Sequence, residues 1–287
     1  RGFGTGAARL VAALPPAGAL VAQLPTATAL AWVPGVRGGE APLRVERLVG
    51  GSINDTWRVD TELGRFVLRV DGPAWRRPGV DREREQQLHE AAGRAGLAPR
   101  LLLRADSDGV QVSEYLEGRR WSEADYIVPR QLRRLGERLA QLHTLEVPAG
   151  ILPFDPVACA RDYLKAMSAE ARAAAEPRAA EIGAAAQQVA DGTSTMSIVH
   201  GDLAHGNVLD GAQLWLLDWE YAQRADPLYD VACALAYYPQ AQPQAAFLLG
   251  AAGAVGARLT ERLAAAIRVY DALSDLWHRV RAHPPRE

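Results

Sequence analysis

Two short runs of this chain decide how the rest of its sequence is interpreted: residues 200–209, which read HGDLAHGNVL, and residues 216–220, which read LLDWE. Between Asn207 and Asp218, two apolar segments flank an Asp-Gly turn signal, which predicts a tight β-hairpin. Such a hairpin sets the Asn207 amide beside the Asp218 carboxylate. Two hard oxygen ligands then face one point, where Mg²⁺ keeps some of its water and bridges nucleotide phosphates. Asp202, five residues before Asn207, stays available to accept a hydroxyl proton.

The order of Asp202, Asn207 and Asp218 matches the layout of the protein-kinase catalytic loop and its metal-binding aspartate. In that layout the first carboxylate orients the acceptor hydroxyl. The sequence therefore predicts phosphoryl transfer, with Asp202 as the catalytic residue and with Asn207 and Asp218 as ligands of Mg²⁺. A transition-metal site at His200 and His205 is not favoured, because no further clustered His or Cys accompanies them.

Upstream of this region, residues 43–70 predict three strands of a small antiparallel meander. Its first turn contains Gly50, Gly51 and Ser52. Paired glycines let a backbone approach phosphates closely, and a serine can donate a hydrogen bond to a phosphate oxygen. We therefore expect this turn to cover the nucleotide phosphates, although the same residues also suit an ordinary hairpin turn.

The third predicted strand carries Arg69 where protein kinases carry a phosphate-binding lysine that pairs with a helix glutamate. The single lysine of the chain, Lys165, lies far from this strand. Arg69 is therefore the candidate, since an arginine fork can contact phosphate bidentately. Residues 81–92 predict a helix with a capping aspartate and early acids. Glu85 is the expected partner of Arg69, Glu83 is its nearest competitor, and an unpaired solvated charge is the remaining alternative.

Residues 110–118 predict a strand that runs into a glycine-ended linker. This stretch resembles the hinge between two kinase lobes, where adenine meets backbone groups of Glu114, Tyr115 and Leu116. Beyond the hinge, apolar residues recur at helical spacing. The predicted helices cover residues 127–145, 156–167, 169–190, 231–238, 244–252 and 260–283.

The expected fold is α+β and bilobal, like that of protein kinases. A small N-terminal lobe holds an antiparallel sheet and one helix, and a larger C-terminal lobe is mainly helical. We divide the chain into an N-terminal extension of short helices at residues 1–42, a nucleotide-binding lobe at residues 43–117, and a catalytic and substrate lobe at residues 118–287.

Residues 200–232 are similar to the aminoglycoside phosphotransferase and choline kinase superfamily, small-molecule kinases with the protein-kinase architecture. Residues 218–221, which read DWEY, resemble its choline, ethanolamine and thiamine kinase branch, because antibiotic kinases commonly carry a small residue at the position of Glu220. An arginine at position 69 agrees with that branch. The resemblance covers about residues 45–240 and implies an enzyme that uses ATP and Mg²⁺ to phosphorylate a hydroxyl of a small cationic alcohol.

Aromatic faces and carboxylates hold a cation at a partly dry site. Glu220, Tyr221 and Trp277 are the candidate substrate contacts, and the resemblance places Trp277 along the acceptor cleft. Trp121 and Tyr126 are weaker candidates. Two other functions stay open: an aminoglycoside-type antibiotic phosphotransferase, and a nucleotide-binding regulatory module without turnover.

The composition of the chain limits its partners. A net charge of −2 and a pI near 6.4 argue against general affinity for nucleic acid, which would show as a strongly basic domain. Prolines interrupt the apolar residues 1–40, so we expect no membrane span. Two cysteines are too few for a disulfide framework, and we expect a reducing cytoplasm. The expected partner is a small-molecule alcohol, and the sequence leaves the oligomeric state open.

Overall fold

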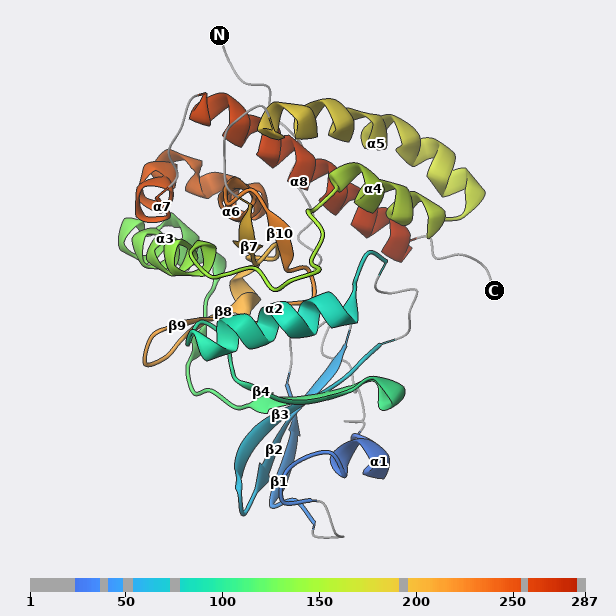
Figure 1. The fold of residues 1–287 in the computed structure, drawn as a ribbon, viewed down its shortest axis with the longest axis vertical. Helices are drawn as coiled ribbons and strands as arrows, with labels where there is room; N and C mark the ends of the chain where they lie inside the picture. Colours follow the sequence, from blue (N-terminus) through green and yellow to red (C-terminus); the bar gives the residue numbers. More distant parts are fainter. Residues whose placement is uncertain are drawn as a thin grey trace.

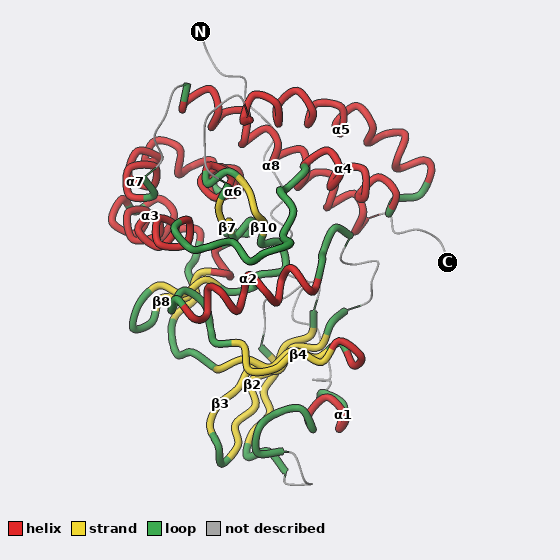
Figure 2. The backbone as a smooth tube through the Cα atoms, viewed as in Figure 1, coloured by secondary structure: helices red, strands yellow, loops and turns green. Residues whose placement is uncertain are grey.

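The computed structural model describes residues 24–36, 41–48, 54–72, 78–190, 196–253 and 258–282. Figure 1 shows a sheet at one end of the molecule and a group of helices at the other, and Figure 2 shows the strands and helices separated in the same way. The predicted bilobal α+β fold is confirmed. The short helices expected before residue 24, and the turn of Gly50, Gly51 and Ser52, lie outside the described residues.

The smaller lobe is a five-stranded antiparallel sheet in the order β1-β2-β3-β5-β4. Alternation along β2 and β3 buries Trp57, Val59, Phe66 and Leu68 on one face, because successive side chains of a strand point to opposite faces. The short helix α1 and Val33 cover this face. The strands are β1 (Arg44–Arg47), β2 (Asp55–Thr61), β3 (Gly64–Val70), β4 (Leu101–Ala105) and β5 (Val110–Glu114), and α1 spans Ala27–Leu30.

Helix α2 (Arg82–Arg94) lies between the sheet and the helical lobe (Figure 1). The Asp81 side chain caps it by accepting the Arg84 backbone N–H at 3.1 Å. Its buried residues Leu88 and Ala92 belong to the hydrophobic core of the helical lobe, not to that of the sheet. The helix that carries Glu85 is therefore anchored on the helical lobe. The predicted boundary between the two lobes after residue 117 stays a prediction.

The larger lobe packs its helices in pairs, with α5 against α8, α6 against α8, and α3 against α7. The predicted helices of this lobe differ from the observed ones by no more than three residues at either end. No helix among the described residues has the length and apolar character that a membrane span requires. The helices are α3 (Pro129–His143), α4 (Pro156–Lys165), α5 (Ala169–Ala190), α6 (Leu228–Tyr237), α7 (Ala245–Ala251) and α8 (Leu259–Ala282).

Short strands and 3-10 turns complete the larger lobe and support its loops. The predicted hairpin is present, and a strand that follows the hinge adds to it as a third strand. Sequence patterns did not predict β4, β6, β7 or β10, because these short runs lack a clear alternation of apolar and polar residues, whereas the Asp-Gly turn signal marked β8 and β9. These elements are β6 (Arg119–Arg120), β7 (Ser197–Val199), β8 (Val208–Asp210), β9 (Leu214–Leu216) and β10 (Gln223–Ala225), with 3-10 turns at Asp106–Asp108, Glu123–Ile127, His205–Asn207 and Pro239–Gln244.

Candidate active site

A cavity of about 560 Å³ lies between the sheet and the helical lobe. Strands β3 and β5, the hinge, the segment from Gly201 to Tyr221 and helix α8 contribute to its wall. Glu85 lies behind this wall. The sequence-predicted residues that line the cavity are Arg69, Glu114, Tyr115, Leu116, Asp202, Asn207, Asp218, Glu220, Tyr221 and Trp277.

The β8–β9 hairpin sets the two predicted metal ligands next to each other. Val208 pairs with Leu216, and the Leu217 backbone N–H donates to the Asn207 carbonyl at 2.8 Å. Asp218 follows with a φ of 63°, in the left-handed region that residues other than glycine rarely adopt. Asn207 and Asp218 therefore enter the cavity from the same end of one hairpin.

Asp202 is held by donors on both of its carboxylate oxygens. Asn207 Nδ2 donates to Asp202 Oδ2 at 2.8 Å, and the Tyr237 hydroxyl donates to Asp202 Oδ1 at 2.9 Å. Burial and the negative charge of Asp218 together raise the pKa of Asp202 to about 6. A carboxylate with that pKa, fixed in orientation and facing a cavity, is suited to accept a proton near neutral pH.

The free atoms of the hairpin residues fit a hard divalent cation. Asn207 uses its Nδ2 to contact Asp202, so its Oδ1 is the atom left to bind a metal ion. Asp218 Oδ1 is buried without a hydrogen-bond donor, and its ion pair with Arg69 Nη1 is long, at 3.9 Å. An amide oxygen and a carboxylate oxygen of this kind match the ligands that Mg²⁺ prefers. Among the residues that the structure describes, no three His, Cys, Asp or Glu side chains group as a metal site.

The backbone of the segment before Asp202 is held by Asp230, which is fully buried on α6. Its carboxylate accepts the backbone N–H of His200 at 3.1 Å and that of Gly201 at 2.9 Å, and His143 Nε2 lies 2.9 Å away. Gly201 has a φ of 75°, and a Cβ at this position would lie 2.4 Å from the Tyr221 carbonyl oxygen. Only glycine fits there, and this close approach fixes the course of the backbone before Asp202.

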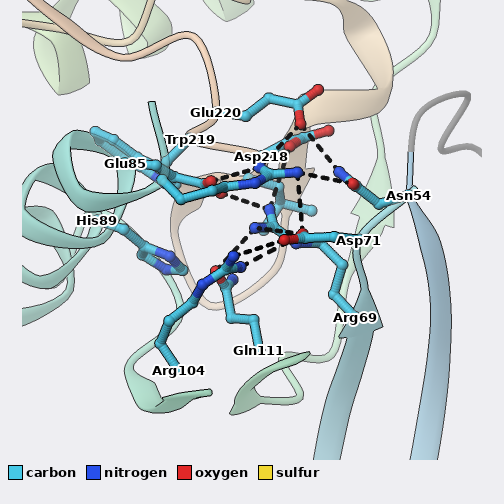
Figure 3. Close-up of polar contacts among 12 residues, drawn as sticks. Asn54, Arg69, Asp71, Glu85, His89, Arg104, Gln111, Asp218, Trp219 and Glu220 are labelled. Atoms are coloured by element: carbon cyan, nitrogen blue, oxygen red, sulfur yellow. Dashed lines mark hydrogen bonds and ion pairs between the residues drawn. The ribbon is translucent and has the colours of Figure 1, made fainter. Parts of the chain in front are cut away.

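Trp219 anchors the residue next to the candidate metal ligand. Its ring stacks on His89 of α2 with centroids 6.1 Å apart, and it meets His200 edge to face at 4.8 Å. Its Nε1 donates to the Leu216 carbonyl at 3.0 Å. Figure 3 shows Trp219 beside His89 and Asp218. The position of Asp218 is thus tied to both lobes through its neighbour.

The expected ion pair between Arg69 and Glu85 is present at 2.5 Å (Figure 3). Gln111 Oε1 accepts a second hydrogen bond from Arg69 at 3.0 Å. Glu83, the competing partner, is exposed and instead accepts from Gln87 Nε2 at 3.3 Å. The buried position of Glu85 on the inner face of α2 explains why it, and not Glu83, meets the arginine.

Arg82, which sequence reasoning missed, connects four parts of the site. Its Nη1 lies 2.5 Å from Glu85 Oε2 and 3.3 Å from Glu220 Oε2. Its Nη2 lies 3.0 Å from both Asn54 Oδ1 and Asp71 Oδ1. Arg82 precedes Glu85 by three residues on one helix face, and that spacing is the only sequence signal of the contact. One guanidinium group thereby joins α2, the residue before β2, the residue after β3 and the segment after β9.

Glu220 lines the cavity but directs its hydrogen bonds toward the sheet lobe. It is 2% exposed, and its Oε2 accepts from Asn54 Nδ2 at 3.0 Å as well as facing Arg82. Burial and the charge of Asp218 raise the pKa of Glu220. Tyr221 and Trp277 lie together elsewhere on the wall, where Trp277 Nε1 donates to the Tyr221 hydroxyl at 2.8 Å.

The two weaker aromatic candidates are not part of the cavity wall. Trp121 and Tyr126 are buried in the core of the helical lobe, with their rings packed edge to face at 5.2 Å. The Tyr126 hydroxyl donates to the Leu203 carbonyl at 2.7 Å. Their role is to support the segment that carries Asp202, and the expectation that they contact an acceptor was wrong.

The hinge residues line the cavity with some of their backbone groups already paired. The Glu114 N–H donates to the Arg100 carbonyl at 3.0 Å, and the Tyr115 N–H donates to the Arg65 carbonyl at 3.1 Å. The Arg58 guanidinium lies 4.6 Å from the Tyr115 ring centroid. A base bound beside this segment would therefore use Leu116 or carbonyl oxygens.

Fold and site together define a small-molecule phosphotransferase. The chain belongs to the phosphotransferase enzyme family, whose pattern matches residues 44–283. The predicted superfamily is thereby confirmed. No curated protein matches the chain at a significant level.

Solved structures of similar fold include choline or ethanolamine kinases and an antibiotic phosphotransferase. A choline/ethanolamine kinase family protein from Mesorhizobium loti is 27% identical, with a TM-score of 0.70 over 89% of this chain and 85% of that one. Choline kinase LicA from Streptococcus pneumoniae is 20% identical, with a TM-score of 0.70 over 84% and 86%. Spectinomycin phosphotransferase APH(9)-Ia, solved with ADP and spectinomycin, is 14% identical, with a TM-score of 0.58 over 84% and 85%. The last two show the fold alone.

The Arg69–Glu85 pair predicts a specific response of stability to acid. Burial alone would raise the pKa of Glu85, but Arg69 and Arg82 outweigh it and lower this pKa to about 2. A carboxyl with a depressed pKa contributes stability above its unfolded pKa, near ~4.3, and loses it as the pH falls toward the folded value. Glu85→Gln should cost about 3 kcal/mol at pH 7, because it leaves buried arginine charge without its partner.

Urea unfolding at pH 7, 5 and 3 measures this effect. The difference between the parent and Glu85→Gln should shrink as the pH falls from 5 to 3. Glu83→Gln, a change at an exposed position of the same helix, should leave the pH dependence of the unfolding free energy unaltered. A difference between parent and Glu85→Gln of equal size at all three pH values would contradict the assignment.

Replacement of Arg82 should reduce turnover by more than the accompanying loss of stability can explain. Arg82→Ala removes the contact between α2 and Glu220, and should lower kcat about tenfold, equivalent to about 1.4 kcal/mol. Arg104→Ala is the matched control, because the Arg104 side chain is also largely enclosed but pairs with Asp71 and Asp106 within the sheet lobe. Steady-state kinetics and melting temperatures of both variants separate the effect on kcat from the effect on stability. Equal losses of kcat would mean that Arg82 acts only through stability.

Proposed function

We propose that this phosphotransferase transfers the γ-phosphoryl group of ATP, with Mg²⁺, to the hydroxyl of a small cationic alcohol of the choline or thiamine type. The observation that carries the proposal is the convergence of Asp202, Asn207 and Asp218 on one cavity. Aromatic side chains line the same cavity, which supplies the surface that a small cation needs.

Each of the three residues has a separate task in the proposed reaction. Asp202 orients the acceptor hydroxyl and takes its proton as the bond from the hydroxyl oxygen to the γ-phosphorus forms and the bond between that phosphorus and ADP breaks, which releases ADP. Asn207 Oδ1 and Asp218 would hold Mg²⁺, which when bound neutralises charge that develops on the phosphate oxygens. Arg69, kept in place by Glu85, steadies the nucleotide phosphates from the sheet side. Positioning and charge then account for the catalysis, as is usual in phosphoryl transfer.

The remaining nucleotide contacts are proposed on position alone. Glu114, Tyr115 and Leu116 line the cavity at the hinge, where the adenine ring would lie. Gly50, Gly51 and Ser52 lie between β1 and β2 in the sequence, outside the described residues, and their proposed contact with the phosphates rests on the sequence pattern.

The acceptor end of the cavity favours one small cation over a polycation. Tyr221 and Trp277 line the cavity together with three further tyrosines, which come from helices α4, α6 and α8. One face of the Trp277 ring already carries the Arg281 guanidinium at 4.8 Å, so a substrate cation would use the other face or the tyrosines. The additional tyrosines are Tyr163, Tyr237 and Tyr270.

An aminoglycoside would need several carboxylates for its ammonium groups. The carboxylates on the described cavity wall are Asp202, Asp218, Glu220 and Glu114. The first two serve the reaction, Glu220 faces Arg82, and Glu114 accepts the Arg100 backbone N–H at 2.8 Å. This arrangement supports the cationic-alcohol proposal, as does the 27% identity to a choline/ethanolamine kinase family protein. A regulatory module without turnover would not need the hydrogen bond by which Asn207 orients the Asp202 carboxylate.

A cytoplasmic location remains part of the proposal. It rests on the sparse cysteines, since Cys159 and Cys233 are both free thiols, as expected in a reducing compartment.

Substitution of the two aspartates should separate chemistry from binding. Asp202→Ala should reduce turnover at least a hundredfold while the affinity for magnesium–ATP stays within about twofold, because Asp202 is assigned to the acceptor. Asp218→Ala should reduce turnover and weaken magnesium–ATP binding about tenfold or more, because it removes a metal ligand. Calorimetric titration and ADP release measure the two quantities. Parental turnover in either variant would refute the role given to that residue.

The acceptor is identified by ADP release across a panel of alcohols, with the phosphorylated product confirmed by mass. Choline or thiamine should be phosphorylated, and kanamycin should not. Trp277→Ala should raise KM for the alcohol about tenfold while KM for ATP stays unchanged, because the ring lies at the acceptor end. Phosphorylation of kanamycin alone would favour the antibiotic kinase, and failure to consume ATP with every alcohol would favour the regulatory module.

A further inference from the structure

Tyr237, the last residue of α6, contacts the residue proposed to orient the acceptor. Its hydroxyl donates to Asp202 Oδ1 at 2.9 Å across 35 positions of sequence. Tyr237 is 40% exposed, and its side chain lines the same cavity as Asp202. Neither a motif nor a periodicity pointed to this residue.

The phenol can only be the donor in this contact. A carboxylate oxygen can only accept, and the negative charge of Asp202 beside it keeps the proton on the Tyr237 hydroxyl. Asn207 Nδ2 donates to the other oxygen, Oδ2, at 2.8 Å. Two donors on two different oxygens hold the carboxylate plane against rotation about the bond to Cβ.

Helix α6 is built to hold this loop from one face. Asp230 accepts the backbone N–H of His200 and Gly201, and Cys233 Sγ accepts that of Leu203 at 3.2 Å. Asp230, Cys233 and Tyr237 are spaced at i, i+3 and i+7, so they share one side of the helix. Asp230 and Cys233 position the loop backbone, and Tyr237, on the same side of the helix, contacts the Asp202 carboxylate.

The cavity side of Tyr237 is where an acceptor alcohol approaches. Each carboxylate oxygen has two lone pairs, so Asp202 can keep both donors and still receive the hydroxyl of a substrate. A carboxylate free to rotate would present its lone pairs in many directions. Fixing a reacting group within a narrow range of geometry accounts for large factors in rate.

We propose that Tyr237 is a positioning residue that holds the Asp202 carboxylate in the orientation that receives the acceptor hydroxyl. This inference rests on the proposed function, because it takes Asp202 as the group that orients the alcohol. Tyr237 acts through Asp202, and the nucleotide and metal ion are bound by other residues.

The test compares Tyr237→Phe with Tyr229→Phe in the full chain, using the alcohol that the parent phosphorylates best. Tyr237→Phe should lower kcat about tenfold while KM for ATP and the melting temperature stay near the parental values. Tyr229, on the same helix, is buried in the core away from the cavity wall, so Tyr229→Phe should leave kcat unchanged. Tyr237→Ala should match Tyr237→Phe in kcat, since both lack the hydroxyl.

Asp202→Asn in the same series separates the inference from the function on which it rests. If Asp202→Asn is inactive and Tyr237→Phe retains the parental kcat, the inference is overturned and the proposed function stands. If Asp202→Asn retains parental turnover, the proposed function fails and the inference fails with it. A loss of ATP affinity in Tyr237→Phe equal to its loss of kcat, or a deficit confined to Tyr237→Ala, would assign Tyr237 a packing role and overturn the inference.

Discussion

The site depends on a buried cluster of opposite charges at the junction of the two lobes. Arg69, Arg82, Glu85 and Glu220 come from a strand, a helix and the segment after a hairpin, and each is almost enclosed. Burying one such charge without its partner costs several kcal/mol, so the folded state requires all of these elements in register. The same requirement brings Asp218, two residues before Glu220, to the end of the cavity.

The two sides of the junction are supported in different ways. Helix α2 presents Glu85 to the sheet but buries Leu88 in the core of the helical lobe, so it links the lobes through both charge and apolar packing. On the other side, α6 holds the loop of Asp202 through Asp230 and further contacts along one face. The loop of Asp202 is thus fixed by α6, while α2 links the two lobes, and both features suit chemistry that depends on positioning.

The proposed acceptor preference follows from how the carboxylates of the cavity are used. A cavity wall whose carboxylates were not engaged in other contacts would suit a substrate with several ammonium groups. Here Glu220, which stands next to the candidate metal ligand in sequence, faces Arg82 and Asn54. The wall left for the acceptor is aromatic, and aromatic faces attract one compact cation without the cost of desolvating an opposing ion pair.

The sequence by itself determined the family, the fold class, most helices and the hairpin that carries Asn207 and Asp218, because these depend on local motifs and local spacing: a turn flanked by apolar runs, and apolar residues at helical intervals. It also pointed to Arg69 and Glu85, since a single strand position and one helix turn define them. Only the tertiary structure decided the contact of Glu220 with Arg82 and that of Tyr237 with Asp202, which join residues 138 and 35 positions apart. Such contacts leave no periodic trace, because they arise where surfaces of separate elements meet.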